Sequence, residues 1–263
     1  MKILVPIKQI LDPSGITFRR DKERMFINRE EYIIEAGSKA AIEAALRLKD
    51  EASDKQELSV VAVSVSPPRA DDALREALAL GCDAAYLLCD EAFDHADIAA
   101  VVRILATAVE QIGDVDLIIA GALASDTGAG QVGPRLAGAL GYAQITGALT
   151  LELDGQACRA IRPWGDGHAA FAAALPAVVT VMPRAFPLRY AHGARIMNAY
   201  RQWEITTWDA GQLGLEPVTL EPLLDLRSES FPPEIPSGEQ YSGDPESVAQ
   251  DAVMTLKLQR LIG

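Results

Sequence analysis

Residues 121–134 are the stretch whose residue types and spacing point most directly to chemistry. The run reads Gly-Ala-Leu-Ala-Ser-Asp-Thr-Gly-Ala-Gly-Gln-Val-Gly-Pro, between a strongly apolar strand and a predicted helix. Small residues let a backbone approach a ligand closely, and a helix N-terminus presents free N–H groups that suit a phosphate. No Gly-Lys-Ser/Thr of a Walker A loop follows, and Gly128-x-Gly130-x-x-Gly133 matches the dinucleotide pattern only formally. The spacing leaves two interpretations open: phosphate binding, or a glycine-rich turn that caps a helix.

Side chains that could perform acid–base, nucleophilic or metal chemistry are scarce. No HxxxH, GxSxG or paired catalytic carboxylate stands out, and no CxxC is present. The histidines lie far apart in the sequence, and the cysteines are most simply interpreted as core or half-buried residues; they are His95, His168, His192, Cys82, Cys89 and Cys158. We therefore expect no catalytic residue and no metal site.

The composition limits the class of protein. Of the 263 residues, 49% are hydrophobic and 23% are charged, which excludes a disordered chain. The 37 acidic and 24 basic residues give a formal net charge of −13 with no visible basic face, so nucleic-acid binding is not expected. The first residues lack the features of a signal peptide, and no apolar run reaches the ~18 residues of a membrane span. We expect a cytoplasmic protein that does not insert into a membrane.

Strands and helices alternate over residues 1–140. Apolar runs predict strands at residues 2–7, 58–65, 84–88 and 115–120, and helical periodicity predicts helices at residues 40–49, 70–80, 97–112 and 131–140. This alternation predicts an α/β fold with an open, mostly parallel, doubly wound sheet and helices on both faces. Ligands bind such sheets beyond the carboxyl ends of the strands, where residues 121–134 would lie. The polar residues 12–33 interrupt the pattern and are interpreted as a hairpin.

The pattern changes after residue 145. Short alternating runs at residues 149–153, 157–162 and 168–173 predict an antiparallel meander. Residues 177–182 are β-branched and apolar, which predicts a strand that returns to the main sheet.

Residues 205–263 differ in composition from the rest. From residue 216 onward there are nine acidic and three basic residues and six of the fifteen prolines, so this stretch cannot form one packed element. It also carries apolar side chains that would be wasted in solvent, and it ends in a helix predicted over residues 248–262. We interpret residues 1–204 as the α/β domain and residues 205–263 as an arm that packs on something else; a disordered tail is the alternative.

Residues 183–200 are basic and aromatic within an acidic protein. They follow the last core strand and contain three arginines and two tyrosines. Such a loop suits binding to another protein, and a loop packed on its own domain is the equal alternative.

Several blocks of the chain resemble, in the same order, the beta subunit of electron transfer flavoprotein, also called the FixA type. The blocks are residues 2–8, 41–49, 61–64 with Pro67, 74–83, 175–180, 189–191 and 196–199. The resemblance covers residues 1–215, and the tail is less similar.

The resemblance implies an electron-carrier subunit rather than an enzyme. It implies a heterodimer with an alpha subunit that holds most of the electron-transferring FAD. The beta subunit would hold AMP, or a second FAD in electron-bifurcating members. Flavin-dependent dehydrogenases would donate electrons, and an acceptor similar to electron-transfer-flavoprotein–quinone oxidoreductase, or a soluble one, would receive them. The C-terminal arm would wrap the alpha subunit.

The resemblance also assigns residues. The nucleotide site would comprise Pro6, Glu35, Gly37, Ser38, Val65, Gly121, Ala122, Asp126, Gly128, Ala129, Gly130, Gln131, Val132 and Gly133. The partner-docking loop would present Arg189, Tyr190, Gly193, Ala194, Arg195 and Met197.

Two departures from the family pattern affect these expectations. Gly128-Ala129-Gly130 replaces the usual polar residues, so only backbone N–H groups would remain there to hold a phosphate. This departure leaves the occupant of the site open: AMP, FAD or nothing. Gly193-Ala194 replaces a leucine anchor and a proline, which predicts different redox partners from the acyl-CoA dehydrogenases. A nucleotide-binding sensor of the universal-stress type is the alternative function, although its glycine loop is not visible; an adenylating enzyme would need a Ser-Gly-Gly loop, and the chain has none.

Overall fold

The computed structural model describes residues 1–19, 21, 24–52, 57–223, 230, 233, 238 and 240–262. Contacts within the chain form two compact units. One comprises residues 1–19 and 24–226, and the other comprises residues 20–23 and 227–263. Each is described by itself.

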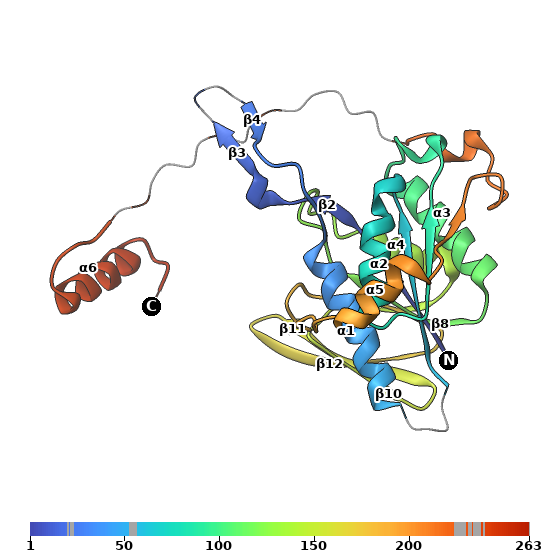
Figure 1. Cartoon of the computed structure of the whole chain (residues 1–263). Helices are drawn as coiled ribbons and strands as arrows, with labels where there is room; N and C mark the ends of the chain where they lie inside the picture. The colour runs from blue at the N-terminus through green and yellow to red at the C-terminus, as the bar shows by residue number, and fades with distance from the viewer. Residues whose placement is uncertain are drawn as a thin grey trace. The chain divides into compact units, whose positions relative to one another are not determined.

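A parallel sheet with helices packed against it organises the larger unit (Figure 1). Its seven strands lie in the order β14-β7-β6-β1-β8-β13-β9. Every neighbouring pair in it is parallel. Its strands are β1 (Lys2–Pro6), β6 (Ser59–Val65), β7 (Ala84–Leu88), β8 (Val115–Gly121), β9 (Ala143–Ala148), β13 (Ala177–Val181) and β14 (Thr206–Trp208). Its helices are α1 (Ala36–Glu51), α2 (Asp71–Leu80), α3 (Ile98–Ile112), α4 (Val132–Leu140) and α5 (Gly193–Arg201).

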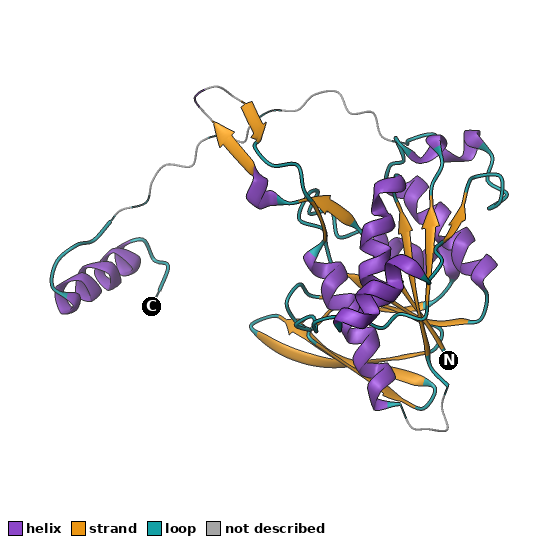
Figure 2. Cartoon of the chain, in the orientation of Figure 1, coloured by secondary structure: helices purple, strands orange, loops and turns teal. Residues whose placement is uncertain are grey.

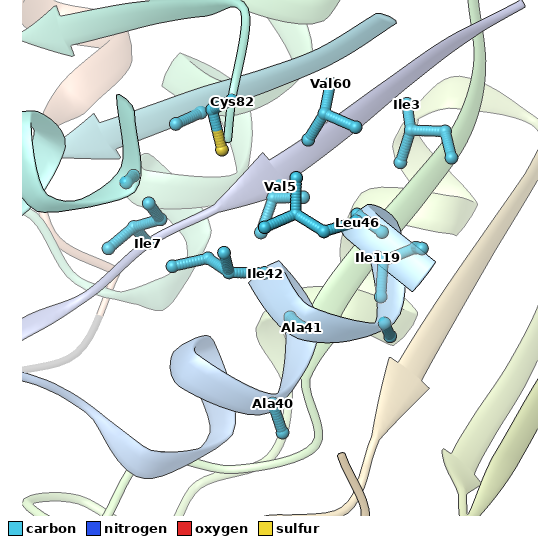
Figure 3. Packing of buried hydrophobic residues seen from close by; sticks show 14 of the residues in the cluster. Ile3, Val5, Ile7, Ala40, Ala41, Ile42, Leu46, Val60, Cys82 and Ile119 are labelled. Atoms are coloured by element: carbon cyan, nitrogen blue, oxygen red, sulfur yellow. The ribbon is translucent and has the colours of Figure 1, made fainter. Parts of the chain in front are cut away.

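The central strands are buried on both faces, as continuous apolar runs in a parallel sheet require. Every residue of β13 is buried. Side chains alternate between two cores, so that Leu117 and Ile119 of β8 face one core and Ile118 faces the other. The first core contains residues of α1 and α2 and is shown in Figure 3, where Ile42 and Leu46 of α1 lie near Val5 and Ile119. The second contains residues of α3 and α4. The doubly wound fold expected from the alternation is confirmed.

Three smaller antiparallel sheets complete the larger unit (Figure 2). The predicted meander is β10 (Thr150–Asp154), β11 (Ala157–Trp164) and β12 (Gly167–Ala174). The excursion at residues 12–33 contains the β3–β4 hairpin, together with a strand that pairs back to residues 9–11. Its strands are β2 (Gln9–Leu11), β3 (Ile16–Arg19), β4 (Arg24–Ile27) and β5 (Tyr32–Ile34). Short 3-10 helices occur at Pro13–Gly15, Pro68–Ala70, Glu91–Phe93 and Pro217–Leu220.

The smaller unit contains helix α6 (Pro245–Leu258). The carboxylate of Asp244 accepts the N–H of Ser247 and caps the helix, which starts three residues before the predicted boundary and ends four residues before it. No side chain of α6 is buried. Its exposed apolar side chains include Val253, Met254, Leu256 and Leu258.

Three short elements were not predicted from the sequence. β9 and β14 add edge strands to the main sheet, and α5 makes the second half of the 183–200 loop helical. β14 lies beyond residue 204 and pairs with β7, and the residues of the chain up to 226 group with the α/β unit. The division at residue 205 stays a prediction.

Candidate nucleotide site and docking surface

The carboxyl ends of β1 and β8 meet at one edge of the sheet. The strand order reverses here, because β6 and β7 extend the sheet on one side of β1 and β8 lies on the other. A cavity of about 420 Å³ opens at this point. Such a switch point is where open α/β sheets bind ligands, and the volume lies within the usual range for small-molecule sites.

Ten of the fourteen predicted nucleotide residues line this cavity. They are Pro6, Glu35, Ser38, Val65, Gly121, Ala122, Ala129, Gly130, Gln131 and Val132. Four stretches that are distant in the sequence thus meet at one place. The binding roles of these residues stay predictions.

The remaining four residues, Gly37, Asp126, Gly128 and Gly133, do not line the cavity. A Cβ on Gly37 would lie 3.0 Å from Cα of Gly121, so both glycines permit α1 to approach the end of β8. Gly128 has a φ of +61°, which allows the loop to turn, and its N–H donates to the carbonyl of Ala124.

Glu35 caps the first helix from inside the protein. Its carboxylate is almost fully buried and accepts the N–H groups of Gly37 and Ser38. This interaction satisfies two free donors at the N-terminus of α1. The start of α1 therefore presents a carboxylate to the cavity, which disfavours a phosphate at that end.

The start of helix α4 is different. Gln131 stands at its N-cap, and no side chain in the described part of the protein forms a capping hydrogen bond there. The first N–H groups of α4 therefore remain available for an anion, and the helix dipole adds a partial positive charge. The start of α3 also lines the cavity, but the carboxylate of Asp97 caps it, so that of the three helix starts at the cavity the start of α4 suits a phosphate best.

Several cavity residues were missed by sequence reasoning. Ile98, Val101 and Leu105 of α3 form part of an apolar wall, and Lys8 and Thr127 add polar groups. Lys8 and Thr127 therefore bring polar side chains to a cavity where residues 128–130 offer only backbone groups, and the expectation about residues 128–130 stays a prediction. The sequence held a signal that could have identified Lys8, because this residue directly follows the strand predicted at residues 2–7.

Gly133 makes a close contact that a matched residue in the same helix lacks. A Cβ on Gly133 would lie 2.2 Å from Cγ2 of Thr180, whereas one on Gly138 would meet nothing within 4 Å. Thr180 is buried, and its hydroxyl accepts the N–H of Gly147, so it cannot turn away freely.

We expect Gly133→Ala to lower the free energy of unfolding by about 2 kcal/mol through overpacking. Gly138→Ala should raise it by about 0.5–1 kcal/mol, because alanine is the better helix former. Urea denaturation of both variants checks the opposite signs. Equal effects at the two positions would contradict the Thr180 contact.

The predicted docking residues divide into two groups. Tyr190, Gly193, Ala194 and Met197 are exposed, and Tyr190 is fully so. Arg195 is held within the protein, because its guanidinium donates to the carbonyls of Leu78 and Ala79. The segment from Gly193 onward is helix α5, not a loop.

Arg189 is also held within the protein. Its Nε lies 2.9 Å from Oε2 of Glu43, and its Nη2 lies 2.8 Å from Oδ2 of Asp50. Burial opposes ionisation of Glu43, but hydrogen bonds from Arg189 and Arg47 outweigh it and lower the pKa of this carboxyl below its ordinary value. The ion pairs position the main chain that leads to Tyr190.

Two structural findings concern metals and membranes. Within the described residues, no group of three or more His, Cys, Asp or Glu side chains is placed to hold a metal ion. None of the described helices has the length and apolar character needed to cross a bilayer.

The chain is similar to known proteins over most or all of its length. Residues 25–213 match the model of the electron transfer flavoprotein domain. The caffeyl-CoA reductase–Etf complex subunit CarD of Acetobacterium woodii is 33% identical, with 100% of each chain covered. The electron transfer flavoprotein subunit beta of Thermoanaerobacterium thermosaccharolyticum is 30% identical, again with 100% of each chain covered. Protein FixA of Azorhizobium caulinodans is 31% identical over 83% of this chain and 79% of its own.

The Thermoanaerobacterium relative is named as an electron transfer flavoprotein subunit, and the Acetobacterium relative as a subunit of a reductase–Etf complex. The chain belongs to the electron transfer flavoprotein family, as an electron-carrier subunit of the beta or FixA type.

Proposed function

We propose that this chain is the beta subunit of a heterodimeric electron transfer flavoprotein and that its cavity holds AMP. The observation that carries the proposal is the cavity at the end of β1 and β8, which is apolar along α3 and open to N–H donors at α4. A purine suits the apolar wall, and a phosphate suits the helix start. The alternative occupant is a second FAD.

The orientation of AMP follows from the difference between the starts of α1 and α4. The Glu35 carboxylate at α1 repels a phosphate and accepts hydrogen bonds from hydroxyl groups, so the ribose fits that side. The phosphate fits residues 126–132. The residues that we propose to hold AMP therefore bind and orient it, and none of them needs to move a proton.

The electron-transferring FAD is held mainly by the alpha subunit in this proposal. Helix α6 packs on that subunit, which accounts for the exposed Met254 and Leu258, whereas β14 belongs to the main sheet of this chain. Flavin dehydrogenases dock on the surface around Tyr190 and Met197, and electrons leave to a quinone-linked or soluble acceptor. Relatives named as parts of reductase complexes support a complex with partner subunits. A cytoplasmic location stays a prediction.

The test is the nucleotide content of the complex. The chain is co-expressed with its alpha partner, the purified complex is denatured, and released FAD and AMP are quantified by chromatography. We expect one FAD and one AMP per heterodimer. Two FAD and no AMP would contradict AMP as the occupant, and a colourless or absent complex would contradict the proposed function and favour the nucleotide-sensor alternative.

A further inference from the structure

Lys8 holds a special position at the cavity. It is the only lysine, arginine or histidine among the described residues that line it. Its main chain is fixed at both ends, because its N–H donates to Oγ of Ser38 at 3.0 Å and its carbonyl accepts the N–H of Glu35 at 2.9 Å. The start of α1 thus determines where the Lys8 side chain leaves the backbone.

The ammonium of Lys8 meets a carboxylate of the loop. Its Nζ lies 2.6 Å from Oδ2 of Asp126, and Oδ1 of Asp126 accepts the N–H of Thr127 at 2.8 Å. The carboxylate therefore engages one cation and one loop N–H group at once. A phosphate at the loop would use the same two donors.

This ion pair is suited to exchange. The side chains of Lys8 and Asp126 are 44% and 40% exposed, and ion pairs of such exposure contribute little to stability. Lysine is a compact charge on a flexible four-carbon stem, so its ammonium can change partners without movement of the backbone. A phosphate carries more charge than a carboxylate and is the stronger acceptor.

The other charged residues at the cavity are acidic. Glu35 is buried and caps α1, and Asp97 caps α3 by accepting the N–H of Ala100. Neither favours an anion. A nucleotide phosphate therefore has Lys8 as its one opposite charge among the described cavity residues.

We propose, building on the proposed function, that Lys8 recognises the phosphate of the bound nucleotide and that Asp126 occupies this place until the phosphate displaces it. Asp126 is then a competitor for the site and not a nucleotide ligand. The site distinguishes a phosphorylated nucleoside from the free nucleoside through Lys8.

The test compares AMP with adenosine, using the heterodimeric complex and equilibrium dialysis against each radiolabelled compound. Lys8→Gln should weaken AMP binding about tenfold, the usual effect of losing a hydrogen bond from a charged group, and leave adenosine binding unchanged. Lys8→Arg should restore most of the AMP affinity. Asp126→Asn should tighten AMP binding about threefold, because an exposed ion pair no longer competes while the amide oxygen still accepts the Thr127 N–H.

Lys39→Gln is the matched control. It removes the same charge from the first turn of α1, but Lys39 does not line the cavity, so its AMP affinity should equal that of the wild type. If Lys8→Gln and Asp126→Asn weaken AMP and adenosine equally, the pair only holds the loop in place and the inference is overturned. The same holds if Lys8→Gln leaves AMP binding unchanged. A wild-type complex that binds neither compound would instead count against AMP as the occupant, and the inference would fall with it.

Discussion

Gly121→Ala should lower the free energy of unfolding by about 3 kcal/mol and abolish retention of AMP. A Cβ on Gly121 would lie 2.8 Å from the carbonyl carbon of Gly37 and 3.1 Å from the backbone nitrogen of Ser38. These atoms belong to main chain at the start of α1, which cannot turn aside as the end of a side chain can. The helix start must shift away from β8, and overpacking of this kind costs several kcal/mol at the upper end.

The same shift would damage the cavity, because Glu35 and Ser38 line it from the start of α1. Loss of AMP and loss of stability are therefore expected together. They are measured by urea denaturation and by the nucleotide content of the purified complex.

Gly128→Ala is the control within the same loop. A Cβ there would meet nothing within 4 Å, and the only cost is the positive φ of +61°. That conformation costs about 1 kcal/mol for an alanine. If both variants were destabilised equally, the close approach of α1 to β8 would not be the constraint that we describe.

Glu43→Gln should lower the free energy of unfolding at neutral pH by about 2–3 kcal/mol, because two arginines lose their shared carboxylate. The Glu43 side chain is 5% exposed and lies 2.9 Å from Nε of both Arg47 and Arg189. It also accepts the backbone N–H of Arg189 at 3.1 Å. The glutamine retains the shape of the side chain but lacks the charge.

The pH dependence of this effect has a definite sign. The pKa of Glu43 is lower in the folded protein than its ordinary value, so the ionised carboxylate stabilises the fold at neutral pH. That contribution is lost as the pH falls through the lowered pKa. The stabilities of wild type and Glu43→Gln should therefore converge in acid, and denaturation curves from pH 7 down to acidic values measure this.

Asp50→Asn is the matched control for Glu43, since Asp50 pairs with the same arginine. Its side chain is 60% exposed, so its loss should cost below about 1 kcal/mol. Because Arg189 directly precedes the exposed Tyr190, we also expect Glu43→Gln to slow electron transfer from a docking dehydrogenase. A Glu43→Gln variant as stable as the wild type at pH 7 would contradict the stabilising role of the buried Glu43 carboxylate.

Much of the fold could be predicted from the sequence by itself. The β-branched runs and the helical periodicity over residues 1–140 predicted the alternating elements. The glycine-rich loop after β8 indicated the edge of the sheet at which the cavity lies. These features are local, since the spacing of apolar residues reports which face of an element is buried. The short edge strands β9 and β14 and helix α5 carry too few apolar residues for a periodic signal.

Only the tertiary structure decided which distant residues meet. The order of the strands brings Lys8 at the end of β1 to Asp126 after β8, and it places Gly37 against Gly121. Arg189 lies in the basic, aromatic segment that predicted a docking role. Glu43 and Asp50 on α1 nevertheless form ion pairs with it within the protein. The charge of a side chain follows from the sequence, but its partner depends on packing across the sheet. Ion pairs and close backbone contacts act over only a few ångströms, and here they join segments that are far apart in the chain.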